Sequence, residues 1–454
     1  MSFTVINPAT GETLKEVAGW DDTQIEAALA QAAAVSADWQ ARGFDERAGL
    51  MLKAAQVLRD NVDNYAPIIT REMGKLIGDS KAEIEKCAKV CEYYAENAAT
   101  FLKDEALASD ASNSYVAYLP MGTVLAVMPW NYPFWQVFRF AAPALMAGNT
   151  GLLKHASNVP ESALAIEDVF HQAGCPQGVF TTMMIRASQV AKVIEDPRVH
   201  AVTLTGSEPA GQQVASTAGH SLKKSVLELG GSDAFIVLED ADLDEAVRNA
   251  IISRYLNSGQ SCIAAKRFIV VDAIAEDFVA RFKAGVEALK TGDPMDPNTT
   301  MGPMAREDLR DELHVQVTDS IAAGAKAITG CEPIEGPGAF YKPSILDRVE
   351  PGVRAYSEEL FGPVAIVIRA RDEADALRIA NESDYGLGGS VWTQDSARGE
   401  RLARQVQSGC TFVNGFVKSD PRLPFGGVKR SGYGRELSSH GIREFVNAKT
   451  IWIK

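Results

Sequence analysis

The stretch "SVLELGGSDAFIVLED" at residues 225–240 decides the fold class of this chain. Apolar runs flank a Gly-Gly pair, which indicates that one strand ends at Glu228 and that another begins just after Gly231. On both sides of this pair, short β-rich runs alternate with helix-like stretches. Strands that alternate with helices form βαβ units and mainly parallel sheets. We therefore expect two α/β domains that meet near residue 230.

The alternation begins at about residue 115, and the first hundred residues are mostly helical in pattern. The segment at residues 21–39, "DDTQIEAALAQAAAVSADW", starts with Asp and Thr residues, which cap helix N-termini. The strands predicted before Gly230 are "TVLAVMPW" (123–130), "GLLKH" (151–155), "GVFTTMM" (178–184) and "AVTLTG" (201–206). Those predicted after it are "KRFIVV" (266–271), "FGPVAIVIRA" (361–370) and "GGSVWT" (388–393).

Composition excludes several classes of protein. With 454 residues, of which 46% are hydrophobic and 23% are charged, the chain is long enough for about three structural units. A net charge of −14 argues against a nucleic-acid-binding surface. We see no signal peptide and no apolar run long enough for a membrane span, so neither secretion nor a membrane partner is expected. The six scattered cysteines are typical of reduced thiols in the cytoplasm.

Two further strand candidates stand outside the alternating series. These are "SNSYVAYLP" at residues 112–120 and the terminal "NAKTIWIK" at residues 447–454. Neither has an obvious helix partner. They are consistent with an arm used in contacts between subunits, and equally with a simple surface hairpin.

Cys262 is a candidate nucleophile because it follows a turn-forming stretch, "NSGQSC" (257–262), and has small alanines after it. A catalytic thiol needs access, a lowered pKa and a place for the oxyanion that forms when it attacks a carbonyl. The sequence around Cys262 supplies the access. A lone cysteine is more often a packing residue, so the other requirements have to come from elsewhere in the chain.

Two residues meet these requirements. Glu228 lies at a strand end among Val, Leu and Gly residues, where desolvation raises a carboxyl pKa toward the range of a general base. Asn131 follows a strand and lies between Pro129 and Pro133, which hold the backbone so that the amide can stabilise an oxyanion. The alternatives are that Glu228 is a solvated carboxylate and that Asn131 only closes a turn.

The turn at Gly206 and Ser207 starts a helix whose N-terminus favours a pyrophosphate.

Together these motifs resemble those of the NAD(P)-dependent aldehyde dehydrogenases in order and spacing. The resemblance covers nearly the whole chain, and within the family it is strongest to succinate-semialdehyde dehydrogenases. It implies a Rossmann-like cofactor domain, an α/β catalytic domain and a small β oligomerisation arm. The matching motifs are "LELGGSDAFIV", "NSGQSC", "MPWNYPFWQ", "TGSEPAG", "EELFGPV" and "LPFGGVKRSGYGRE".

The resemblance also implies roles for individual residues. Cys262 would attack the aldehyde, Asn131 would hold the oxyanion, and Glu228 would activate the water that hydrolyses the thioester. The residues expected to bind the dinucleotide are Trp130, Lys154, Ser157, Gly206, Ser207, Leu229, Glu359 and Phe361. The family's common "KPSE" reads "KHAS" at residues 154–157, so a serine replaces the glutamate that would repel a 2′-phosphate. We therefore expect NADP to be preferred and NAD to be possible, although the extra charge of Glu208 opposes this preference.

For the substrate, the resemblance points to a carboxylate-binding tunnel. Arg139 and Ser419 match residues that share the substrate carboxylate in succinate-semialdehyde dehydrogenases, and Trp135, Phe425 and Tyr132 would form the walls. The alternative for Arg139 is a structural ion pair with a nearby acid. Leu256 departs from the pattern, since a second arginine often stands there, and this favours weaker carboxylate binding or looser chain-length preference.

The expected function is oxidation of succinate semialdehyde to succinate with NADP or NAD, in the cytoplasm, by a homodimer or homotetramer without a catalytic metal. A general aldehyde dehydrogenase, or one for another ω-carboxy aldehyde such as glutarate semialdehyde, is the alternative. We expect the domains to comprise residues 1–97 and 120–229 (cofactor), 230–442 (catalysis), and 98–119 with 443–454 (arm).

Overall fold

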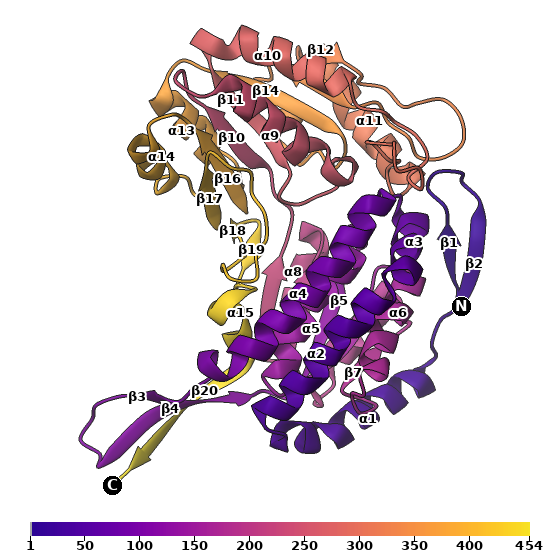
Figure 1. The fold of residues 1–454 in the computed structure, drawn as a ribbon, viewed down its shortest axis with the longest axis vertical. Helices are drawn as coiled ribbons and strands as arrows, with labels where there is room; N and C mark the ends of the chain where they lie inside the picture. The colour runs from indigo at the N-terminus through magenta and orange to yellow at the C-terminus, as the bar shows by residue number, and fades with distance from the viewer. Residues whose placement is uncertain (1) are drawn as a thin grey trace.

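A computed structural model describes residues 2–454, which form two lobes with a projecting arm (Figure 1). The chain begins with an antiparallel hairpin that sequence patterns do not indicate, β1 (Ser2–Ile6) and β2 (Thr13–Ala18). Four helices follow: α1 (Asp22–Ala41), α2 (Phe44–Asp60), α3 (Val62–Met73) and α4 (Ile77–Phe101). The predicted helix start is confirmed, since Asp21 and Gln24 form a reciprocal capping box at α1.

The lower lobe in Figure 1 contains a six-stranded sheet in the order β19-β9-β8-β5-β6-β7. Its strands are β5 (Thr123–Met128), β6 (Thr150–His155), β7 (Phe180–Thr182), β8 (Val199–Thr205), β9 (Lys224–Glu228) and the short antiparallel β19 (Gly432–Tyr433). The first five are parallel, and the order reverses between β5 and β8. Ligands of open parallel sheets bind at such a reversal, outside the carboxyl ends of the strands.

Helices cover both faces of this sheet. They are α5 (Pro133–Met146), α6 (Pro160–Gln172), η1 (Ala187–Gln189), α7 (Val190–Glu195), α8 (Glu208–His220) and α15 (Ser438–Arg443). Every residue of α5 is buried, because α5 packs between the sheet and α4. Cys87 and Cys91 lie in the same core, as a packed pair rather than at a surface.

The upper lobe contains a seven-stranded sheet in the order β12-β13-β14-β11-β10-β16-β17, with only β12 antiparallel. Its strands are β10 (Asp233–Val237), β11 (Ala265–Val271), β12 (Lys326–Thr329), β13 (Ser344–Asp347), β14 (Val364–Ala370), β16 (Gly388–Trp392) and β17 (Cys410–Val413). The helices are α9 (Leu243–Tyr255), η2 (Leu256–Gly259), α10 (Asp272–Glu287), α11 (Glu307–Ala322), α12 (Arg354–Ser357), α13 (Glu373–Asn381) and α14 (Ser396–Ala403).

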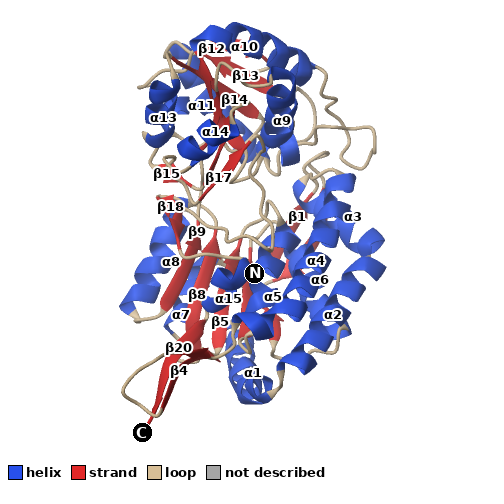
Figure 2. Cartoon of the chain, turned by 60° about the vertical axis from the view of Figure 1, so that its left-hand side comes forward, coloured by secondary structure: helices blue, strands red, loops and turns tan. Residues whose placement is uncertain are grey.

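Two smaller sheets complete the fold. β15 (Tyr385–Gly386) pairs with β18 (Val428–Lys429) between the lobes, as Figure 2 shows. β4 (Asn113–Pro120) pairs along its whole length with β20 (Val446–Ile453) and also with β3 (Glu105–Ala106), forming the arm at whose tip the chain ends. Apart from β19, the strands of the two large sheets lie on either side of residue 230 in the sequence. The residue boundaries of the domains stay predictions.

Candidate active site

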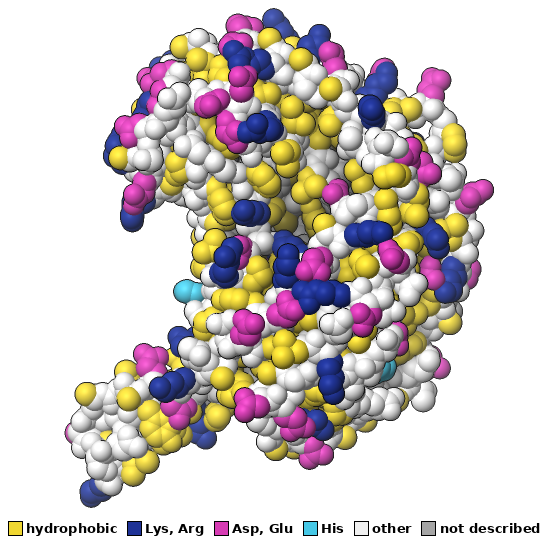
Figure 3. All heavy atoms as spheres, viewed as in Figure 1, with side chains coloured by type: hydrophobic (Ala, Val, Ile, Leu, Met, Phe, Trp, Pro, Cys, Tyr) yellow, Lys and Arg dark blue, Asp and Glu magenta, His cyan; other side chains and the backbone are white. Residues whose placement is uncertain are grey.

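A cavity of about 210 Å³ lies where the lobes meet, in the hollowed face visible in Figure 3. Five segments enclose it: α4, α5, the end of α9, the turn around Cys262, and the loop at residues 416–425. Its lining is mostly apolar, with tryptophan, tyrosine and phenylalanine side chains, and it includes the half-buried Cys262. A thiol at the wall of an apolar cavity can reach a small organic substrate.

The turn before Cys262 is held in an uncommon conformation. Asn257 and Ser258 have φ angles of 55° and 54°, in the left-handed region that residues other than glycine rarely adopt. The next residue, Gly259, has a φ of 72°, and a Cβ there would lie 2.2 Å from the carbonyl oxygen of Gly362. Side-chain hydrogen bonds hold the turn, including one from Asn257 Nδ2 to the Asn131 carbonyl at 2.9 Å. Such strain persists where the surroundings position a functional group.

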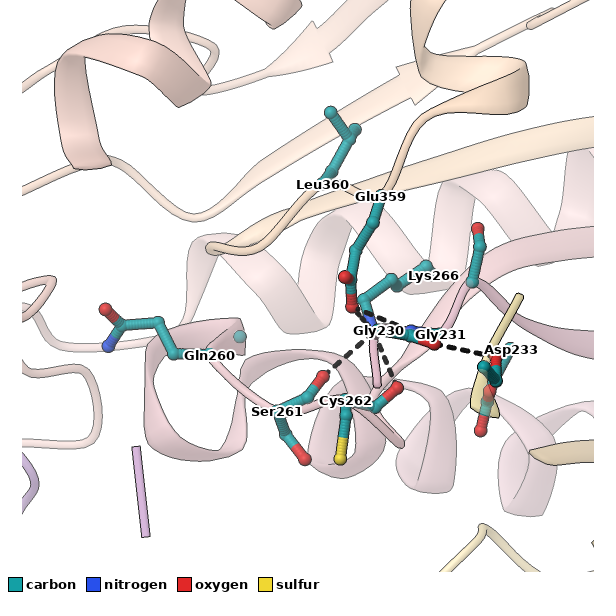
Figure 4. Close-up of polar contacts among 12 residues, drawn as sticks. Gly230, Gly231, Asp233, Gln260, Ser261, Cys262, Lys266, Glu359 and Leu360 are labelled. Carbon is teal, nitrogen blue, oxygen red and sulfur yellow. Dashed lines mark hydrogen bonds and ion pairs between the residues drawn. The ribbon is translucent and has the colours of Figure 1, made fainter. Parts of the chain in front are cut away.

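Burial of Cys262 favours its neutral thiol over the thiolate. Burial raises the pKa of its thiol to about 12, and the positive charges of Arg139 and Lys266 oppose this shift. Figure 4 shows the sulfur pointing away from Lys266, whose ammonium donates to the Cys262 carbonyl at 2.9 Å. The thiol therefore needs a base before it can attack a carbonyl.

Glu228 lies at the carboxyl end of β9 and is the candidate base for the hydrolysis step. It is 1% exposed, and neither carboxylate oxygen has a hydrogen-bond partner within residues 2–454. Burial raises its pKa to about 8; the neighbouring Glu436 adds to the shift, and Arg139 opposes it. A carboxyl group with this pKa can accept a proton near neutral pH, as a general base must.

Asn131 lies between β5 and α5 and is 4% exposed. Its amide Nδ2 donates to the carbonyl of Gln260 at 3.1 Å, two residues before Cys262. Since an amide carries two N–H groups, this bond fixes the side chain and leaves one donor. The arrangement fits the oxyanion-stabilising role expected from the sequence.

A second cavity, of about 690 Å³, lies beyond the carboxyl ends of β5 and β6 and contains three residues expected to hold the cofactor, Trp130, Lys154 and Ser157. Lys154 is 8% exposed and forms no ion pair within residues 2–454; burial lowers its pKa. The buried Asn158 Nδ2 has no partner there either. A cation and an amide without partners fit the phosphate and ribose of a dinucleotide.

The helix start expected to face a pyrophosphate is present at the switch between β5 and β8. Ser207 is the N-cap of α8, and its side chain makes no capping bond. Leu229 packs against this helix: a Cβ on Gly211 would lie 2.5 Å from Leu229 Cδ2. Glu208, whose charge opposes phosphate binding, forms an ion pair with Arg430. Because Arg430 compensates the charge of Glu208, that charge opposes the binding of NADP less than the sequence suggests.

Glu359 and Phe361 approach the site from the upper lobe. Glu359 accepts a hydrogen bond from the Gly231 amide at 3.1 Å and forms an ion pair with Lys266 at 3.1 Å, as drawn in Figure 4. Phe361 meets Trp130 edge to face, with ring centroids 5.8 Å apart. These contacts bring the expected cofactor residues of the two lobes together across the cleft.

The structure brings all the expected substrate residues to the first cavity: Arg139, Ser419, Phe425, Trp135, Tyr132 and Leu256. Arg139 lies over the Phe425 ring, 4.8 Å from its centroid, and forms an ion pair with the buried Glu436. The structural ion pair considered as an alternative for Arg139 is therefore present.

Two residues of the site were missed by sequence reasoning. Glu436 lies in the motif "GYGRE", where its charge could have been noted as a possible partner of Arg139. Lys86 lies in the middle of α4 and lines the substrate cavity, but its position in an ordinary helical pattern gives no local signal. Only the packing of α4 against α5 brings it there.

Comparisons with known proteins agree with this geometry. A profile described as the Aldehyde dehydrogenase family matches residues 1–451. A probable succinate-semialdehyde dehydrogenase [NADP(+)] of Synechocystis sp. is 49% identical, and succinate-semialdehyde dehydrogenase [NADP(+)] 1 of Mycobacterium tuberculosis is 51% identical, each over the full length of both chains.

Among solved structures, succinic semialdehyde dehydrogenase from Streptococcus pyogenes, in complex with NADP+, superimposes with a TM-score of 0.98 at 38% identity over 99% of each chain. This likeness confirms the α/β fold expected from the sequence. The profile match and the full-length relatives lead to one conclusion: this chain belongs to the aldehyde dehydrogenase family.

Proposed function

We propose that this chain oxidises succinate semialdehyde to succinate with NADP as the preferred hydride acceptor. One observation carries the proposal: a single apolar cavity contains the Cys262 thiol together with cationic and hydroxyl groups that suit a carboxylate. An aldehyde with a carboxylate at its other end matches both features. The names of the two full-length relatives support the same substrate and cofactor.

The reaction divides among the residues of the site. The Cys262 thiol releases its proton to solvent and its sulfur attacks the aldehyde carbon, and the Asn131 amide stabilises the resulting oxyanion. Trp130, Lys154 and Ser157 in the second cavity would hold NADP, which would supply the acceptor for the hydride that leaves this carbon as it becomes a thioester. Glu228 takes a proton from water, the water oxygen attacks the thioester carbon, and the carbon–sulfur bond breaks as the sulfur receives that proton. The products are a carboxylic acid and the free thiol.

The preference for NADP rests on the group at residue 157. Ser157 lies in the same cavity as Lys154, whose charge no carboxylate within residues 2–454 neutralises by ion pairing. A 2′-phosphate can accept hydrogen bonds from both side chains. NAD lacks this phosphate, so it gains neither contact and binds more weakly.

A broader ω-carboxy or general aldehyde dehydrogenase is the second candidate. It is favoured by Leu256, an apolar residue that lines the cavity, and by the engagement of Arg139 with Glu436. Both features reduce the positive charge available to a substrate carboxylate. Glutarate semialdehyde, one methylene longer, is the substrate that tests chain-length preference.

Initial rates of reduced-cofactor formation distinguish these functions. We expect succinate semialdehyde to exceed butyraldehyde, an uncharged aldehyde of equal length, by about a hundredfold in kcat/KM, because a buried charge-assisted contact is worth roughly 1.5–3 kcal/mol. NADP should exceed NAD with either aldehyde. Equal kcat/KM for the two aldehydes would contradict the proposal and favour a general aldehyde dehydrogenase.

We also propose that the arm joins copies of this chain into a homodimer or homotetramer. Its strand β20 exposes two large apolar side chains, Trp452 and Ile453, which are 50% and 46% exposed. The proposed domains are those expected from the sequence, and the cytoplasm is the proposed location, in keeping with six free cysteines. Within residues 2–454, no helix is both long enough and apolar enough to cross a membrane.

A further inference from the structure

The positive charge of Arg139 is already paired with a carboxylate of the protein. Arg139 is 2% exposed, and its ion pair with Glu436 is buried with it. Glu228 belongs to the same electrostatic cluster, since Arg139 opposes the rise of its pKa. Removing one partner of a buried ion pair leaves an uncompensated charge, which is costly. Arg139 therefore cannot turn fully toward a substrate without leaving the buried Glu436 carboxylate without its partner.

Lys86 is a second cation in the same cavity, and its charge has no such partner. Its ammonium donates to Ser419 Oγ at 2.8 Å and lies 3.9 Å from the centroid of the Trp135 ring. No carboxylate within residues 2–454 lies at ion-pair distance from Lys86, so a hydroxyl and an aromatic face are its main contacts. Burial lowers its pKa to about 8, and repulsion from Arg139 adds to this shift.

We propose that Lys86 and Ser419 form the binding site for the substrate carboxylate, while Arg139 serves to hold Glu436. The proposal rests on the function proposed above and specifies its recognition step. In the structure the Ser419 oxygen accepts a bond from Lys86, so its own hydrogen is available for a carboxylate oxygen. The substrate would then pair with a half-buried ammonium that has no carboxylate of residues 2–454 at ion-pair distance, although Asp79 and Glu83 also line the cavity.

This assignment also accounts for Leu256. Leu256 lines the cavity in a place where an arginine would put a second guanidinium near Lys86 and Arg139. A further cation in this small space would repel Lys86 and Arg139. With leucine there, Lys86 supplies the positive charge from α4, on a different side of the cavity.

The test uses the full-length enzyme and four variants. Lys86→Met removes the charge and keeps an unbranched side chain, and Lys86→Arg restores a cation. Lys89→Met is the matched control, because Lys89 lies on the same helix but is 65% exposed at its side chain and pairs with Glu85. Arg139→Met tests the other cation. The measurements are kcat and KM for succinate semialdehyde and butyraldehyde, succinate binding by calorimetry, and Tm as a check on folding.

We expect Lys86→Met to lower the kcat/KM ratio of succinate semialdehyde over butyraldehyde by about a hundredfold, mainly through KM. It should also abolish measurable succinate binding, and Lys86→Arg should recover most of both. Arg139→Met should lower kcat for both aldehydes alike. The Lys86 assignment is overturned if Lys86→Met keeps the ratio while Arg139→Met loses it. If the wild-type enzyme shows no preference for the carboxylated aldehyde, the proposed function fails instead.

Discussion

Replacing Glu228 by glutamine should separate the two halves of the reaction. Glu228 is 1% exposed and its carboxylate lacks hydrogen-bond partners within residues 2–454, so glutamine of the same size should fit without a change of fold. The amide cannot accept a proton from water, and the thioester on Cys262 should then accumulate. We expect a burst of one reduced cofactor per active site, followed by turnover about a hundredfold or more below wild type.

The size of the pH effect follows from the pKa of Glu228, which burial raises to about 8. Only the ionised carboxylate is a base, so about one-tenth of the enzyme is active in hydrolysis at pH 7 and about nine-tenths at pH 9. If hydrolysis limits turnover, kcat of the wild type should rise about tenfold between these values and then level off. In Glu228→Gln, attack by hydroxide should rise with pH without levelling.

The assay is stopped-flow detection of the reduced cofactor at saturating substrate from pH 6.5 to 10. Glu167→Gln is the matched control, because burial also raises the pKa of Glu167, which lies in α6 and accepts a bond from the Thr182 amide. This control should keep the wild-type profile. Two results would refute the assignment of Glu228 as the base. One is a wild-type kcat that does not change across this pH range although a burst precedes the steady state. The other is a Glu228→Gln variant with wild-type turnover.

Three further predictions concern other parts of the molecule. Asn131→Ala should lower kcat by about 10²–10³ while Tm changes little, and unchanged steady-state kinetics would remove Asn131 from the oxyanion site. Ser157→Glu should lower kcat/KM for NADP by roughly a hundredfold and spare NAD, because a carboxylate repels the 2′-phosphate; an equal loss with both cofactors would argue against this. A chain ending at Phe445 lacks β20 and should elute as a monomer in light-scattering chromatography, whereas an unchanged mass would exclude the arm from assembly.

Much of the fold and of the candidate site was predictable because the signals are local. Alternating strands and helices around Gly230 report which segments can form a parallel sheet, and two such sheets are present. Cys262, Glu228 and Asn131 each stand at the end of a strand or turn that sequence marks with Gly or Pro. The β1–β2 hairpin was missed, because its second strand is mostly exposed and lacks the alternation of buried and exposed residues that identifies a strand.

The sequence by itself determined the fold class, the chemical groups of the reaction and the likeness of the chain to its family, since these depend on residue types at fixed spacings. The tertiary structure decided which charges face one another. Lys86 meets Ser419 across 333 residues, and Arg139 on α5 meets Glu436 near the C-terminus. The energy of a charge depends on the groups that share its buried surroundings, and helix and strand periodicity carry no information about partners so far apart. Which cation of the substrate cavity is ion-paired, and which has no carboxylate partner, can therefore be seen only in the folded chain.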